Sequence, residues 1–372
     1  MSAAPPVPPT TAAPRPARPK ASGFNWKTGL GIGISAVLLY YAFRGQPLGE
    51  VAAAIRDADF LLLILATAVA TTVFWIRAWR WRAILDPVRK GTTFHSRFAA
   101  VNIGFMANNL LPARVGEFAR AYAISRLEPV SVVAGLSSLV IERLFDALTL
   151  VAMLFITMAL PGFPAWPANP EVDFPLIAQR LALIVGIGGG TLFLLVLWPR
   201  QTVAAFEAVA NRLLPNRLRR PIVDALAAFL AGASVLRDAR LIVEVALWSS
   251  VLWLVNAFSF WIAMHAFGIN VSYTGAIFFN SCLAFAVAVP AAPGFLGTFE
   301  TGAILVLNGL WGYERARVLG FALGFHVAAF IPVTAMGLYY AHRLGLSLGG
   351  VAKAEEVVEE AVEEATGRTA GD

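Results

Sequence analysis

The chain has 372 residues, of which 58% are hydrophobic and only 14% are charged, and its mean hydropathy is +0.69. This composition excludes a soluble globular domain, and the recurring apolar runs of roughly eighteen residues or more predict a polytopic α-helical membrane protein. The net charge of +6 comes largely from arginines that lie between apolar runs, a pattern that indicates membrane topology rather than nucleic-acid binding.

The rare cysteine and histidine residues exclude two further kinds of chemistry. Cys282 is the only cysteine, so an internal disulfide is impossible. His95, His265, His326 and His342 do not have the spacing of metal ligands. The sequence therefore predicts no metal site and no cofactor.

The chain begins with a Pro- and Ala-rich segment, residues 1–23, which lacks an apolar core and is predicted to be a disordered tail rather than a signal peptide. Trp26–Phe43 is the first predicted span, and its glycines favour close helix packing over a nucleotide-binding loop because no strand precedes them. The short amphipathic segment Leu48–Ala58 leads to the second span, Phe60–Trp81. That span ends in alternating tryptophans and arginines, so we expect its end to lie at a water interface.

The next apolar segment is interrupted at its centre. Pro112 should end a helix that arrives from Phe94 and begin a second helix that runs to about Ser125. Each arm is at most about 27 Å long, at ~1.5 Å per residue, which is short for a hydrocarbon core of about 30 Å. We therefore expect a re-entrant hairpin, which enters and leaves on the same side, rather than two spans.

This hairpin carries most of the candidate site residues. Arg114, Glu117 and Arg120 recur at intervals of three and form a charged stripe along the second arm. A membrane accepts charge and broken backbone at depth only where protein or water covers them, so the stripe is predicted to line a polar cavity. The remaining candidates in the hairpin are Asn108, Asn109, Pro112 and Gly116.

A long span, Val130–Leu160, follows the hairpin, and a loop without Lys or Arg, Pro161–Pro175, connects it to the span Leu176–Trp198. Arg200–Arg240 alternates arginines with apolar residues and is predicted to form amphipathic helices on the cytoplasmic surface. Leu241–Phe267 then returns across the membrane.

A second broken segment follows. Tyr273–Val289 leads to a break at Val289–Glu300, Thr301–Leu310 returns, and Arg317–His342 is the last predicted span. Residues 344–372 form an acidic tail. The candidate site residues at this break are Pro293, Gly294, Gly297 and Glu300.

The predicted elements repeat. Residues 24–343 form the transmembrane domain, in which residues 24–160 and 176–343 each contain two spans, a hairpin and a further span. Each half has an odd number of crossings, so the second half should be inverted relative to the first. A constant offset of 181 residues, as from Pro112 to Pro293, supports the pairing. Inverted repeats are characteristic of secondary transporters, whose substrate sites lie where broken helices meet. The arginine distribution places both termini in the cytoplasm.

The breaks suggest anion binding. Each exposes a helix N-terminus, whose free N–H groups and positive dipole end attract negative charge. Arg114 can bind a phosphate through two hydrogen bonds, and Glu117 and Glu300 can balance its charge or carry a coupling proton. The alternative is that Arg114, Glu117 and Arg120 only pair with one another and hold the hairpin together.

A further set of charges lies near the middle of the fourth apolar segment: Glu142, Arg143 and Asp146. Charge at that depth indicates function. A self-neutralising cluster that fixes helix packing is an equally good interpretation.

Three motifs in order resemble a known family: N-x-L-P-x-R-x-G-E-x-x-R at Asn109–Arg120, E-R-x-x-D at Glu142–Asp146, and P-G-x-x-G-x-x-E at Pro293–Glu300. They look like the transmembrane flippase region of lysylphosphatidylglycerol synthases and its stand-alone relatives, over roughly residues 25–343. The resemblance implies an inner-membrane protein that translocates a lipid or a lipid-linked molecule. About thirty residues follow His342, too few for the aminoacyl-transferase domain of the synthases, so lysyl transfer is not expected.

Three functions remain open on the sequence alone. The first is a lipid flippase or transporter whose partners are membrane lipids with an anionic or lipid-linked headgroup. The second is a membrane-embedded enzyme that modifies a lipid, although no catalytic motif is present in the sequence. The third is a non-catalytic scaffold that docks partners through Arg200–Arg240. The sequence does not decide the oligomeric state.

Overall fold

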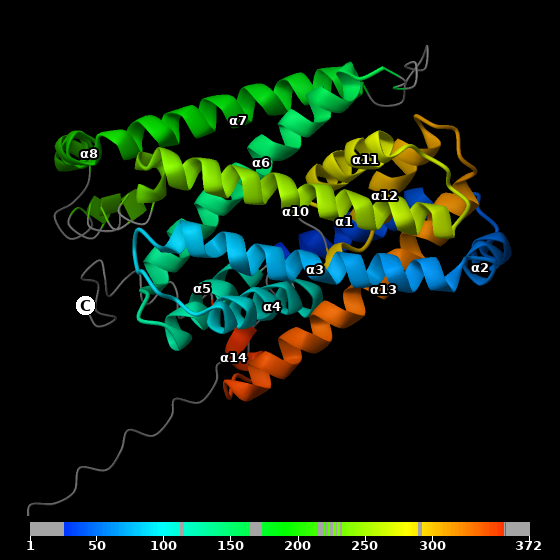
Figure 1. Ribbon diagram of the computed structural model, residues 1–372, viewed down its shortest axis with the longest axis horizontal. Helices are drawn as coiled ribbons and strands as arrows, with labels where there is room; N and C mark the ends of the chain where they lie inside the picture. The colour runs from blue at the N-terminus through cyan, green and yellow to red at the C-terminus, as the bar shows by residue number, and fades with distance from the viewer. Residues whose placement is uncertain are drawn as a thin grey trace, which may run out of the picture.

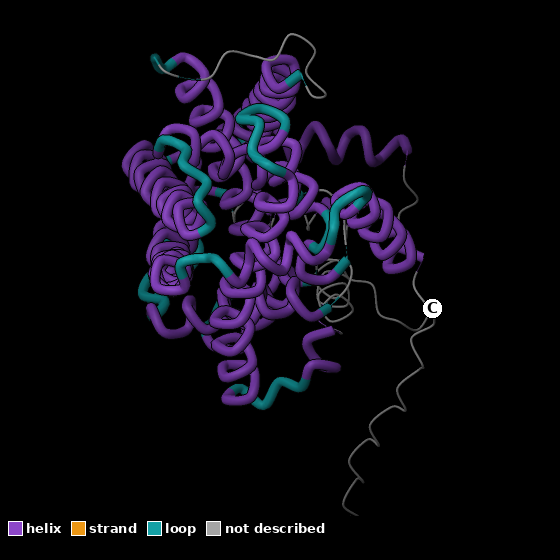
Figure 2. The backbone as a smooth tube through the Cα atoms, turned by 90° about the vertical axis from the view of Figure 1, so that its right-hand side faces the viewer, coloured by secondary structure: helices purple, strands orange, loops and turns teal. Residues whose placement is uncertain are grey.

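The computed structural model describes residues 26–111, 115–161, 163, 173–213, 219, 222–223, 226–227, 229–230, 233–288, 292–352 and 354. All regular secondary structure in these ranges is helical (Figures 1 and 2). Four of the helices, α3, α7, α10 and α13, are long and apolar enough to cross a membrane. The protein is therefore an all-α polytopic membrane protein, as the composition predicts. The predicted tail at residues 1–23 and most of the acidic tail lie outside the described residues.

The first half contains six helices in the described ranges, and polar side chains cap the start of several. The helices are α1 (Trp26–Phe43), α2 (Leu48–Arg56), α3 (Phe60–Leu85), α4 (Phe94–Leu110), α5 (Gly116–Leu127) and α6 (Val132–Ala159). Asp59 accepts the backbone N–H groups of Leu61 and Leu62 at the start of α3, and Ser131 accepts that of Ala134 at the start of α6. Such caps satisfy donors that a helix leaves free at its first turn.

The second half begins with α7 (Phe174–Leu197), which is followed by α8 (Pro199–Leu213) and the short 3-10 helix η2 (Ser234–Arg237). It continues with α10 (Ala239–Ala266), α11 (Tyr273–Ala286), the 3-10 turn η3 (Pro293–Phe295), α12 (Thr298–Ala303), the π-helical turn η4 (Ile304–Asn308), α13 (Arg315–Arg343) and α14 (Leu348–Ala352). Part of the predicted amphipathic region 200–240 lies outside the described residues, and α8 forms its first part.

Both predicted helix breaks are present, and each folds into a helical hairpin. The first comprises α4 and α5, which pack so closely that a Cβ atom on Gly116 would lie 2.2 Å from the carbonyl oxygen of Gly104. The second comprises α11 and the segment from η3 to η4. Gly294 and Gly297 adopt φ angles of +70° and +89° there, a backbone region that glycine enters without steric cost. Whether the hairpins are re-entrant with respect to the bilayer stays a prediction.

The two halves interlock around α3 and α10, which run antiparallel (Figure 1). At one end the backbone N–H of Asp59 donates to the carbonyl of Ala266, and at the other Arg82 pairs with Glu244 at 2.7 Å. The last helix of each half packs on the broken helix of the other, α13 on α4 and α6 on α11. This exchange is what two antiparallel copies of one unit produce, so it supports the predicted inverted repeat.

The hairpins reach toward each other from opposite ends of the long helices. The base of the first lies beside the end of α3, where Arg97 donates to the carbonyl of Ala78 at 2.8 Å. The second begins beside the end of α10, where the indole of Trp261 donates to the carbonyl of Val271. Their tips meet, because α4 packs on η3. The break positions thus come together in the interior of the molecule.

Candidate functional site

A buried charge network joins α3, α5 and α6. Glu142 and Asp146 lie one turn apart on α6, and Arg120 of α5 binds Glu142 through two hydrogen bonds of 2.8 Å. Arg77 and Arg80 of α3 each pair with both carboxylates. All five side chains are at most 6% exposed. Charges this deeply buried persist only when they neutralise one another, so the network binds three helices together.

An outer ion pair extends this network. Arg143 of α6 binds Glu117 of α5 at 2.8 Å and approaches Asp146 at 3.7 Å. Glu117 and Arg120 therefore both pair with α6, contrary to the alternative in which the hairpin charges only pair among themselves. Arg114 and Pro112 lie outside the described residues, so their predicted roles stay predictions.

The interpretation of the end of α3 as an interfacial belt is wrong for half of its residues. Trp75 and Trp79 are exposed, but Arg80 and Trp81 are fully buried and Arg77 is 5% exposed. The buried residues recur at intervals of three and four, so they share the face that packs on α6. That spacing is the signal in the sequence that could have identified Arg77 and Arg80.

Trp81 is also part of the network. Its indole donates to the hydroxyl of Ser138 on α6 at 2.9 Å, and its ring lies 3.9 Å from the guanidinium carbon of Arg120. The predicted intramembrane set Glu142, Arg143 and Asp146 is thus neither isolated nor self-neutralising, because arginines of two other helices complete it.

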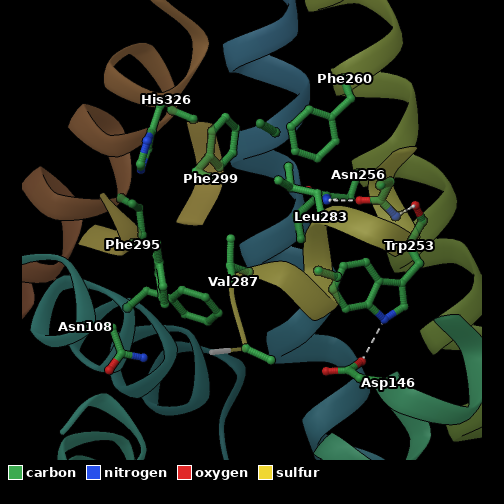
Figure 3. A pocket seen from close by; sticks show the side chains of 18 of the residues that line it. Asn108, Asp146, Trp253, Asn256, Phe260, Leu283, Val287, Phe295, Phe299 and His326 are labelled. Atoms are coloured by element: carbon green, nitrogen blue, oxygen red, sulfur yellow. Dashed lines mark hydrogen bonds between the residues drawn. The ribbon is translucent and has the colours of Figure 1, made fainter. Parts of the chain in front are cut away.

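A cavity of about 380 Å³ lies between the hairpin tips and the long helices (Figure 3). Its polar lining residues are Arg77, Asn108, Asn109, Arg143, Asp146, Asn256, Asn280 and His326. Its aromatic lining residues are Phe74, Phe105, Trp253, Phe260, Phe285, Phe295, Phe299, Phe325 and Phe330. Figure 3 shows Asp146 at one end of the cavity and His326 at the other. The cavity is therefore amphiphilic, with the charged network at one end and aromatic side chains along most of its wall.

The first hairpin contributes two asparagines to the cavity. The side-chain oxygen of Asn108 accepts the backbone N–H of Gly116 at 2.8 Å and so ties the end of α4 to the start of α5. Asn109 donates to the hydroxyl of Thr334 on α13 at 2.9 Å. Its backbone oxygen faces Gly294, where an added Cβ would lie 3.5 Å away. The predicted residues Asn108, Asn109 and Gly116 are thus brought to the tip.

The second hairpin is held by Glu300, which is fully buried. One carboxylate oxygen accepts the backbone N–H of Gly297 at 2.6 Å, and the other lies 2.8 Å from Nδ1 of His326. His326 also stacks on Phe299 at 4.4 Å between ring centroids. Glu300 does not line the cavity, whereas His326 does. His326 therefore connects the buried Glu300 to the cavity lining.

Helix α1 supports the same break. The hydroxyl of Ser35 donates to the carbonyl of Leu296 and accepts the backbone N–H of Ala292, both at 2.7 Å. A Cβ atom on Gly297 would lie 2.8 Å from the carbonyl oxygen of Ser35. Gly297 thus allows the close approach of α1, and Pro293 opens the 3-10 turn before it. The serine was not predicted, because its partners are more than 250 residues away in the chain.

The sequence matches a known protein family over most of its length. Residues 29–337 match the family described as the lysylphosphatidylglycerol synthase TM region. The chain belongs to this family. The match covers both hairpins.

Several curated proteins are similar to this family member. Glycosyltransferase AglD of Haloferax volcanii is 24% identical over 74% of the chain, which aligns with 47% of that protein. A UPF0104 membrane protein of Methanothermobacter thermautotrophicus is 22% identical over 77% of the chain and 84% of its own length. The UPF0104 membrane protein MJ1078 of Methanocaldococcus jannaschii is 23% identical over 54% of the chain and 78% of its own length. The chain thus spans about half of the glycosyltransferase but most of the two UPF0104 proteins.

Proposed function

We propose that the protein moves a lipid or a lipid-linked molecule across the membrane through the cavity between its two hairpins. The observation that carries this proposal is the lining of the cavity: a charged and polar end for a headgroup, and an aromatic wall for an apolar chain. A purely hydrophilic solute would leave the aromatic wall without a partner. A purely apolar solute would desolvate the charged end without replacing its hydrogen bonds.

The architecture supports transport over a passive scaffold. The exchange of packing partners between the halves fits an inverted repeat, and in transporters of that kind the substrate site lies where broken helices meet. The cavity occupies that position, because residues of both hairpin tips line it. A scaffold has no use for a central cavity with costly buried charge. The inner-membrane location and the cytoplasmic termini are part of the proposal.

A second candidate is an enzyme that modifies a lipid-linked molecule. It is favoured by one observation, the name of the glycosyltransferase relative. That protein aligns with the chain over only part of its length. Both candidates place an amphiphilic molecule in the same cavity, and they differ in whether that molecule is chemically changed.

The test uses the full chain reconstituted into vesicles that contain a trace of headgroup-labelled phosphatidylglycerol. A membrane-impermeant quencher reports how fast the label moves between leaflets, and mass spectrometry of the extracted lipid reports its chemical state. We expect faster movement than in protein-free vesicles with the lipid unchanged. A changed lipid mass would favour the enzyme, and movement no faster than in protein-free vesicles would contradict the proposal for this lipid class.

A further inference from the structure

The charge network carries an excess positive charge, and this bears on which headgroup the proposed transport site would accept. Among the residues that the structure describes, four guanidinium groups (Arg77, Arg80, Arg120 and Arg143) face three carboxylates (Glu117, Glu142 and Asp146). One positive charge therefore has no partner within the network. Because most of the network is buried, water compensates this charge poorly.

Arg77 is a buried arginine of the network that faces the cavity. Both of its ion pairs are made through one nitrogen, Nη1, at 3.2 and 3.4 Å, and its buried Nε has no hydrogen-bond partner in the described part of the chain. Its guanidinium carbon lies 5.1 Å from the ring centre of Phe105 and 5.6 Å from that of Trp253. Arg77 and both rings line the cavity.

Arg143 brings a second cation to the same end of the cavity. It lines the cavity, its side chain is 44% exposed, and it approaches the same oxygen of Asp146 that Arg77 approaches. Arg80 and Arg120, by contrast, do not line the cavity. Arg77 and Arg143 are therefore the two guanidiniums of the network that face the cavity.

Among the other polar groups near this end, the side chain of Asn108 is suited to an anion. The side-chain oxygen of Asn108 is occupied by the N–H of Gly116, so its amide group is left to act as a donor. The indole N–H of Trp253 already binds Asp146 at 3.0 Å. Glu300 is not part of the network, because its carboxylate is bound to Gly297 and His326 and does not line the cavity.

We propose that Arg77 and Arg143 bind the phosphodiester of a lipid headgroup that carries a single net negative charge, with the acyl chains along the aromatic wall. This inference rests on the proposed transport function and names the substrate class of the same cavity. Guanidiniums bind phosphate through charge-assisted hydrogen bonds. A zwitterionic lipid offers the same phosphate, but its ammonium group brings positive charge to a site that already has an excess.

The first test measures binding to the parent chain in detergent, without transport. Radiolabelled dioleoylphosphatidylglycerol is displaced by unlabelled phosphatidylglycerol, by phosphatidylcholine or by the cationic dioleoyl-trimethylammonium-propane. We expect phosphatidylglycerol to compete about tenfold better than phosphatidylcholine, because the excess positive charge of the site repels the ammonium group, and we expect the cationic lipid to compete least. Equal competition by the three lipids would overturn the inference.

Charge variants make the test specific to the cavity. Arg143→Gln removes the excess charge and should abolish the preference for phosphatidylglycerol, whereas Glu117→Gln frees Arg143 and should increase that preference severalfold. Arg82→Gln is the matched control, because it removes an arginine of the exposed pair with Glu244, away from the cavity. If Arg143→Gln folds and keeps the parental preference, the site is not where we place it. If that variant does not fold, the lipid series on the parent chain still decides.

The measurements of lipid binding and of lipid movement distinguish the proposed headgroup site from the proposed transport function. A preference for phosphatidylglycerol without lipid movement would support the headgroup site and contradict transport. Lipid movement without any preference between phosphatidylglycerol and phosphatidylcholine would overturn the headgroup site and support transport.

Discussion

At the scale of single residues, Glu142 is the centre of the charge network. It receives two hydrogen bonds from Arg120 and pairs with Arg77 and Arg80, while its side chain is 1% exposed. Glu142 thus neutralises three buried guanidinium groups, whose positive charges depend on it for compensation. Removing one partner of a buried pair leaves the others without compensation.

We therefore expect Glu142→Gln to destabilise the folded protein by roughly 3–5 kcal/mol, the range for breaking a buried ion pair. The measurement is thermal unfolding of the purified chain in detergent. Glu244→Gln is the control, because Glu244 pairs with Arg82 in a more exposed setting, where such a pair contributes about 0–1 kcal/mol. Equal shifts in the two variants would show that the network does not stabilise the fold.

The charge network was only partly predictable from the sequence. Glu142 and Asp146 were predictable as buried charges, because they interrupt a long apolar segment. Their main partners Arg77 and Arg80 were not assigned, because an arginine near a helix end fits an interface equally well. The choice between these interpretations depends on which helix covers that face, and a single sequence does not contain this information.

At the scale of elements, the two helix breaks were predictable because their cause is local. Proline ends a helix and glycine permits a positive φ angle wherever they occur. What holds the second break was not predictable, because Ser35 comes from α1 and His326 from α13. The break is thus encoded locally, but its geometry is fixed by distant contacts.

The second break provides an element-scale prediction. Gly297→Ala should destabilise the fold by about 1–3 kcal/mol, because alanine is strained at this backbone conformation and its Cβ would meet the carbonyl of Ser35. Gly45→Ala is the control: it has a φ angle of +73° but open space around it. Thermal unfolding should show the larger loss for Gly297→Ala. A loss no larger than that of Gly45→Ala would contradict a close packing of α1 on this break.

At the scale of the whole molecule, parity was the strongest argument from sequence, since two halves with an odd number of crossings must be inverted. The antiparallel pair α3 and α10 and the exchanged partners of α6 and α13 support that argument. The cavity itself was only partly predictable. The sequence indicated a polar site at the hairpin tips, but the aromatic wall comes from six α-helices and the turn η3, whose neighbours the sequence does not specify.

Topology is testable by labelling from either side of the membrane. In a Cys282→Ala background, single cysteines replace Asp57, Lys90, Glu207 or Glu314, all of which are exposed. We expect an impermeant thiol reagent to reach positions 57 and 314 from outside the cell and positions 90 and 207 only from inside. Labelling of positions 57 and 90 from the same side would contradict both the proposed orientation and the single crossing by α3.

The central claim is that lipid passes through the cavity between the hairpins, and a pair of matched substitutions on α6 tests it most directly. Ala147 lines the cavity, whereas Ala152, on the same helix, is exposed on the outer surface. The measurement is the initial rate at which labelled phosphatidylglycerol moves between leaflets of vesicles that contain equal amounts of folded protein. The account predicts that Ala147→Trp reduces this rate to that of protein-free vesicles, while Ala152→Trp moves lipid like the parent. A folded Ala147→Trp variant that moves lipid at the parental rate would contradict the account.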